Sequence, residues 1–286
     1  MEYHIPGLNI FYIILTAILI TIIFFGLIIF AKKRLSNLSN ASLLFGCLTW
    51  FIAIFVESIF HSVLLPLFSH NIFSYAIYGG LMAGLFEETG RLICFYFKIK
   101  PSKYHKNNSL YYGIGHGGFE AFYLVSINNL AMVFVCYLIN KGLLKEYKEK
   151  ESLTDTEKQM LEQMENIYNS LKNEKSFFNI CFCVVWERIS AITFHISASV
   201  LVWFASNDFK KYYFLYLLAI GLHSTLDCIS VILGHYISII IIVEFFIFIM
   251  AIGCAYIGYK YWKFFENNIE VKQNLIEYEN ITNTLN

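Results

Sequence analysis

The sequence lacks the cysteine spacing and the charge excess that mark several common classes of protein. Its cysteines show no CxxC pair and lie within apolar segments, at Cys47, Cys94, Cys136, Cys181, Cys183, Cys228 and Cys254. Neither a disulfide framework nor a thiolate metal site is indicated. The 21 basic residues balance the 21 acidic residues, so the chain has no general attraction to nucleic acid.

The first apolar segment also lacks the features of a cleavable signal peptide. No basic residue precedes it, Lys32, Lys33 and Arg34 follow it, and no small-residue cleavage pattern is evident. We expect it to remain as a signal anchor.

Apolar residues are abundant: 57% of the chain is hydrophobic and 18% aromatic, with a mean hydropathy of +0.56. These values indicate an integral membrane protein. The chain divides into about seven apolar segments near the length of a spanning helix, at residues 8–30, 42–66, 72–98, 110–140, 177–206, 212–233 and 236–262. We therefore predict an all-α, polytopic bundle of about seven transmembrane helices, with one membrane domain over residues 1–265.

Positive charge falls on one side of this predicted bundle. Lys and Arg occur in the connections around Lys32–Arg34, Lys98–Lys106, Lys210–Lys211 and Lys260–Lys263. The opposite short connections, around His70 and Gly234, have none. By the positive-inside rule, the amino terminus lies outside and the polar tail of residues 266–286 is cytoplasmic, as expected for a bacterial cytoplasmic membrane.

One long connection, residues 141–176, contains a predicted amphipathic helix. Met160, Met164, Ile167, Tyr168 and Leu171 follow helical spacing. Thr154 and Glu157 fit a capping box, so the helix should begin near Asp155. The extracytoplasmic loop is either a solvated hairpin on the membrane domain or a lid over a substrate.

Ionisable residues interrupt four of the apolar segments. They are Glu87, Glu88 and Arg91; His116 and Glu120; Arg188 and His195; and His223 and Asp227. Such residues at membrane depth are costly and usually functional. Counted at the rise of a helix, Glu87, Glu120, His195 and His223 lie about 16 Å below the cytoplasmic ends of their segments. We therefore predict one intramembrane site, with Arg188 nearer the outer surface.

Structural roles are the alternative for some of these residues. Glu88 and Arg91, three residues apart, can form an ion pair within one helix. Glu57 and His61 fit ordinary hydrogen-bonded packing positions. Glu87 then lacks a partner on its own helix, which makes it the natural general base.

The motifs resemble the YhfC family of intramembrane peptidases, itself similar to the CAAX-protease and bacteriocin-processing superfamily of glutamic-type intramembrane proteases. The motifs are the paired glutamates and arginine of residues 87–91, the glycine-rich run of residues 113–121 around His116, residues 187–196, and residues 223–227. Tyr112, four residues before His116, fits the superfamily's aromatic position. The arginine comes one residue earlier than the superfamily spacing, and His195 has no counterpart there.

The resemblance implies that the chain cleaves membrane-embedded or membrane-adjacent peptides without a cofactor. Glu87 and His116 would activate water, Glu88 and Arg91 would hold the first motif, and His223 with Asp227 would stabilise the oxyanion. Glu120, Arg188 and His195 would have supporting roles.

Two alternatives remain open. In the first, His116, His195 and His223 bind zinc and Glu87 is the general base, although no HExxH spacing is present. In the second, the buried acids and histidines form a proton relay in a small transporter or channel. The lack of inverted repeats disfavours the second alternative.

Overall fold

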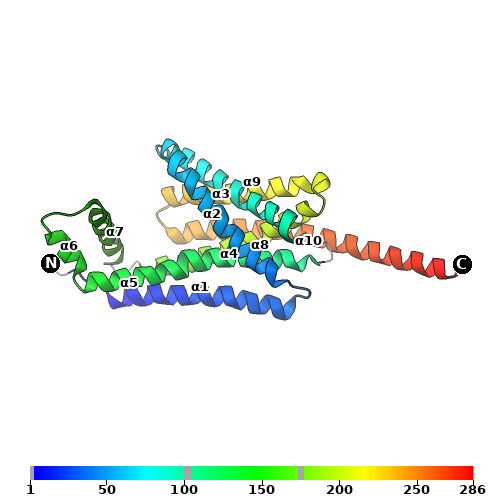
Figure 1. The fold of residues 1–286 in the computed structure, drawn as a ribbon, viewed down its shortest axis with the longest axis horizontal. Helices are drawn as coiled ribbons and strands as arrows, with labels where there is room; N and C mark the ends of the chain where they lie inside the picture. The colour runs from blue at the N-terminus through cyan, green and yellow to red at the C-terminus, as the bar shows by residue number, and fades with distance from the viewer. Residues whose placement is uncertain (1–2, 100–104, 173–176, 286) are drawn as a thin grey trace. The chain divides into compact units, whose positions relative to one another are not determined.

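The computed structural model describes residues 3–99, 105–172 and 177–285, and these residues form helices without strands. The helices are α1 (Gly7–Arg34), α2 (Asn40–Phe68), α3 (Ile72–Cys94), α4 (Asn107–Ala121), α5 (Asn128–Asn140), α6 (Leu143–Glu149), α7 (Asp155–Leu171), α8 (Phe177–Asn207), α9 (Phe209–Tyr236) and α10 (Ile240–Leu285) (Figure 1). Two π-helical stretches, Phe95–Ile99 and Phe122–Ile127, follow α3 and α4. The prediction of an all-α protein is confirmed.

Six stretches of the described residues are long and apolar enough to cross a membrane: Gly7–Arg34, Asn40–Phe68, Asn107–Asn140, Cys181–Asn207, Phe209–Tyr236 and Ile240–Glu266. They match six of the seven predicted segments. The seventh, α3, is not among them because it carries Glu87, Glu88 and Arg91. The chain is an integral membrane protein in which one of the predicted membrane segments carries three charged residues close together.

The helices belong to two compact units. The first comprises residues 1–26 and 121–188, and the second comprises residues 27–120 and 189–286. Each unit has a hydrophobic core of its own.

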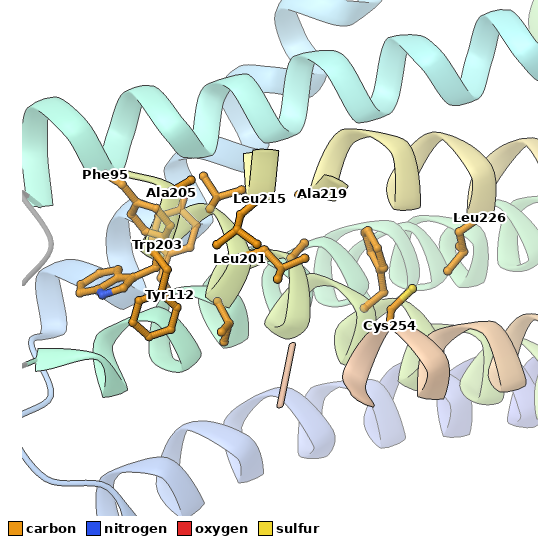
Figure 2. Close-up of a cluster of buried hydrophobic side chains, with 14 of the residues drawn as sticks. Phe95, Tyr112, Leu201, Trp203, Ala205, Leu215, Ala219, Leu226 and Cys254 are labelled. Atoms are coloured by element: carbon orange, nitrogen blue, oxygen red, sulfur yellow. The ribbon is translucent and has the colours of Figure 1, made fainter. Parts of the chain in front are cut away.

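In the second unit, α3 packs against both α2 and α9 (Figure 1). Its main core joins α3, α4, α8, α9 and α10 (Figure 2). Phe95 lies at the centre of an aromatic contact, with its ring centroid 4.4 Å from Tyr112 and 5.1 Å from Trp203. This core holds the helices that carry the ionisable residues.

In the first unit, α7 begins at Asp155, as predicted. Thr154 is its N-cap, and the capping box with Glu157 is complete. Met164 and Leu171 are buried in a core shared with α5 and α6, whereas Met160 is exposed although its spacing placed it on the apolar face. The side of the membrane on which α7 lies remains a prediction.

Candidate intramembrane site

The predicted ionisable residues of the second unit lie together in one polar layer. We use this name for Glu87, Glu88 and Arg91 of α3, His116 and Glu120 of α4, His195 of α8, and His223 and Asp227 of α9. Three of them, Glu88, Arg91 and His116, are completely buried. Charges buried in this way must be paired within the protein.

Glu88 is the partner of two cationic side chains. Arg91, one helical turn further along α3, forms an ion pair with Glu88 Oε2. His223 Nδ1 of α9 lies 2.9 Å from Glu88 Oε1. The ion pair predicted within α3 is therefore present, and Glu88 also connects α3 to α9.

Glu87 faces the histidines of two other helices. His116 Nε2 is hydrogen-bonded to Glu87 Oε2 over 2.9 Å, and His195 Nδ1 lies 4.0 Å from the same oxygen. The ring centroids of His116 and His195 are 4.8 Å apart. The structure thus brings together the carboxylate and the histidine that the sequence suggested as a water-activating pair.

His195 has partners that fix its tautomer. Arg91 Nη2 lies 3.3 Å from His195 Nδ1, and since a guanidinium can only donate, Nδ1 is the acceptor. The ring proton is then on Nε2, which lies 2.7 Å from Glu120 Oε2. This histidine, which the superfamily motifs do not include, lies at the centre of the layer.

His223 lies between two carboxylates. Besides the contact with Glu88, its Nε2 is 3.5 Å from Asp227 Oδ2, and the Asp227 side chain is 35% exposed. Both ring nitrogens therefore face acceptors, an arrangement that suits an imidazolium donating from each nitrogen. The contact of His223 with Asp227 is longer than its contact with Glu88, and the Asp227 side chain is more exposed than that of Glu88.

Glycines bring α4 close enough to α8 for these contacts. A Cβ atom at Gly113 would lie 2.6 Å from Ile196 Cα, and one at Gly117 would lie 2.8 Å from His195 Cβ. The helix α4 is continuous across the glycine-rich run. Close helix packing therefore accounts for these glycines.

Arg188 is not part of the layer described above. It belongs to the first unit, where its guanidinium pairs with Glu187. Its supporting role remains a prediction.

A second group of polar residues, not connected to the site by the sequence analysis, lies on α2 and α3. His61 Nε2 is 3.0 Å from Glu57 Oε1, and His61 Nδ1 is 3.1 Å from the Tyr78 hydroxyl. The four-residue spacing of Glu57 and His61 could have indicated that they pair, but nothing in the sequence pointed to Tyr78.

Two sets of ligand atoms in the layer lie close enough together to be candidates for holding a metal ion. They are Glu87, His116 and His195, and Glu88, His195 and His223, with the ligand atoms of each set within 4.8 Å of one another and all these residues buried. Carboxylate and imidazole groups are the ligands of many catalytic zinc sites.

The fold and this layer define an integral membrane protein with a buried acid-base or metal-binding site. A family model described as YhfC intramembrane metalloprotease matches residues 16–247. A protein of Bacillus subtilis (strain 168), described as "Uncharacterized membrane protein YhfC", is 30% identical over 200 residues, which cover 67% of this chain and 72% of that protein. No solved structure matches.

The chain belongs to the YhfC family, as its motifs indicated, and so to a family of intramembrane proteases. The family description includes a metal, which fits the zinc alternative of the sequence analysis better than a protein without a cofactor. The likeness to the CAAX-protease and bacteriocin-processing superfamily remains a prediction.

Proposed function

We propose that this chain is a zinc-dependent intramembrane protease and that Glu87, His116 and His195 hold the ion. The observation that carries the proposal is the buried set of one carboxylate and two imidazoles, with ligand atoms within 4.8 Å of one another. Catalytic zinc sites keep three protein ligands and one open position. The set has this number and type of ligands.

The second set fits a cation less well. Glu88 already accepts from Arg91 and from His223. His223 faces a carboxylate with each nitrogen, so its lone pairs are not available while it donates to both. The proposed site therefore differs in one ligand from the alternative in which three histidines bind zinc: Glu87 replaces His223.

The charges of the layer support a divalent ion. Its carboxylates belong to Glu87, Glu88, Glu120 and Asp227. Among the described residues of the layer, the cationic groups that face them are the Arg91 guanidinium and an imidazolium at His223. About two negative charges remain without a counter-charge, a costly state in a medium of low dielectric. A doubly charged cation would balance them.

The partners of the two histidines agree with a ligand role. His195 Nε2 faces Glu120, as in carboxylate-histidine-metal arrangements, and its Nδ1 lone pair accepts from Arg91, so ligation at Nδ1 would replace that hydrogen bond. His116 presents Nε2 to Glu87. Ligation at this nitrogen would displace its proton, so metal binding should release protons.

When bound, zinc would polarise the scissile carbonyl and activate a water molecule for attack. Glu87 has two carboxylate oxygens, so one can be a ligand while the other accepts the proton of the attacking water and passes it to the leaving amine. His223 Nε2, loosely paired with Asp227 at 3.5 Å, is the donor that can turn toward the developing oxyanion. Glu88 anchors the other nitrogen of that ring.

The substrate that this position favours is a peptide segment in or beside the bilayer. The layer lies within helices that are otherwise apolar, so a scissile bond must be presented at membrane depth. A comparison of membrane peptidomes from cells with the parent chain and with Glu87→Ala would reveal the products. Fragments that depend on Glu87 are the expected result.

The test of the metal is elemental analysis of the purified full-length chain. We expect about one zinc per chain and loss of that zinc in His116→Ala and in His195→Ala. Glu120→Gln should weaken zinc binding about 10- to 100-fold, because it removes the group that orients His195. His61→Ala, a histidine of the same unit outside the layer, is the matched control and should keep the metal. Zinc that is retained in both ligand variants would contradict the proposed site.

A metal-free mechanism is the second candidate, and the 2.9 Å hydrogen bond between His116 and Glu87 is the observation that favours it. This pair could activate water as a general base and its partner. Full activity of a chain with no bound metal, insensitive to chelators, would select this mechanism. A cation flux in liposomes, abolished by Glu87→Gln and without proteolysis, would instead revive the transporter alternative.

A further inference from the structure

An apolar cavity of about 470 Å³ lies within the second unit, between α2 and α3 with the π-helical stretch that follows α3. One stripe of α2, including Leu48, Ala53 and Val56, forms one wall. Phe86, Gly90 and Lys98 belong to the other wall. The lining of the cavity includes none of the residues of the polar layer, so the two are distinct.

The cavity is open at its rim and closed at its floor. Leu48, Ile52 and Ile93 at the rim are exposed, whereas Ala53 and Cys94 are buried. Exposed apolar residues on an integral membrane protein face the acyl chains of lipids. The cavity therefore opens toward the bilayer and not toward water.

Its dimensions fit an acyl chain better than a helix. From Phe86 to Lys98 the wall is about 18 Å long at the rise of a helix, close to half of the roughly 30 Å hydrocarbon core of a bilayer. A helix of that length and of about 10 Å diameter would need about 1,400 Å³. The cavity has about a third of this volume and lies within the range of ligand pockets, about 300–1,000 Å³.

The polar end of the cavity is basic. Lys98 is the charged residue of its lining and lies at the end of the wall opposite to Phe86. A basic group at one end of an apolar groove complements an amphiphile with an anionic head. A phosphate at Lys98 would leave an acyl chain directed along the groove toward Phe86.

We propose that the cavity between α2 and α3 binds an anionic phospholipid of the leaflet at the Lys98 end, with its phosphate on Lys98 and one acyl chain in the groove. The acyl chain would contact Gly90, which is adjacent to Arg91 of the polar layer. The proposal does not depend on proteolysis or on metal.

The test uses the full-length chain in nanodiscs of phosphatidylcholine and a photoactivatable phosphatidylglycerol with the reactive group on its acyl chain. We expect crosslinks in the segments 45–56 and 86–94. Lys98→Ala should reduce them about fivefold, which corresponds to about 1 kcal/mol for one basic residue at an anionic surface. Lys98→Arg should keep them. Lys210→Ala, an exposed lysine that is not in the lining, is the control and should leave them unchanged.

Two further measurements decide the chemistry of the occupant. A phosphatidylcholine probe should label the same segments several-fold less, and equal labelling would overturn the choice of an anionic lipid. Ala53→Phe fills the groove and should remove the crosslinks while Lys98 is intact. Crosslinks spread evenly over the lipid-facing helices, or unchanged in Lys98→Ala, would show that no such site exists.

Discussion

Arg91→Ala is the substitution that tests the organisation of the polar layer most directly. The Arg91 and Glu88 side chains form an ion pair and are both completely buried. Arg91 also donates to His195 over 3.3 Å. The substitution removes both contacts and leaves the Glu88 carboxylate with one cationic partner, His223, at 2.9 Å.

The expected loss of stability follows from these contacts. Breaking a buried ion pair by removal of one partner costs about 3–5 kcal/mol, because the remaining charge is uncompensated. His223 still faces Glu88, so the loss should lie near the lower end of this range, at about 3 kcal/mol. Arg91→Lys keeps the charge but not the planar fork that reaches Glu88 and His195 together. Its loss should be intermediate.

The assay is reversible unfolding of the purified chain in mixed micelles, with the free energy of unfolding measured for the parent, Arg91→Ala, Glu88→Gln and the double variant. Because the two residues form one pair, the double variant should be more stable than the sum of the single losses predicts, by more than about 1 kcal/mol. An Arg91→Ala chain within about 0.5 kcal/mol of the parent would refute the pairing as the basis of stability in this layer.

Three more predictions concern packing, topology and pH. Gly115→Ala should destabilise the chain strongly, because the added Cβ atom would overlap with the backbone of α2. Gly253→Ala is the comparison: a Cβ atom there meets open space, so this substitution should be neutral or stabilising. Thermal unfolding of the two variants measures the difference. A cysteine at Ser152 should react with a membrane-impermeant thiol reagent in intact cells and one at Ser36 only after lysis, and the reverse pattern would invert the topology. The pKa of Glu157 is lowered to about 2 by Lys150 and the capping box, so its stabilisation of α7 should be complete above pH 4.5 and lost as the pH falls through 2. Helix content that falls with a midpoint near 4.5 in an acid titration would contradict this.

Much of the fold could be predicted because the bilayer restricts it. Hydropathy alone located six of the spanning stretches, and their bounds differ from the predicted segments by a few residues at most ends. The apolar segment predicted at residues 72–98 corresponds to α3, and its ionisable residues Glu87, Glu88 and Arg91 were recognised because they interrupt an apolar run. The capping box fixed the start of α7 at Asp155, since two side chains satisfy the helix end reciprocally.

The division of the chain into two units could not be predicted in this way. A break between units depends on which helices pack together, and α1 and the stretch from α4 to α5 each contribute residues to both units. Hydropathy gives the length of a helix but not its neighbours. The single membrane domain over residues 1–265 stays a prediction.

The partners within the polar layer show where prediction from the sequence ends. Depth along a helix follows from residue counts, so Glu87, His195 and His223 were expected at one level, and the structure brings them together. The partner of each residue depends on the rotation of helices that are far apart in the chain: Glu88 meets His223 across 135 residues. That contact places His223 between two carboxylates and leaves Glu87 beside His116 and His195. Ligand type alone had suggested three histidines, but a histidine that donates from both nitrogens has no lone pair for a metal. For this reason the proposed zinc site takes Glu87, which the sequence suggested only as a base, as its third ligand.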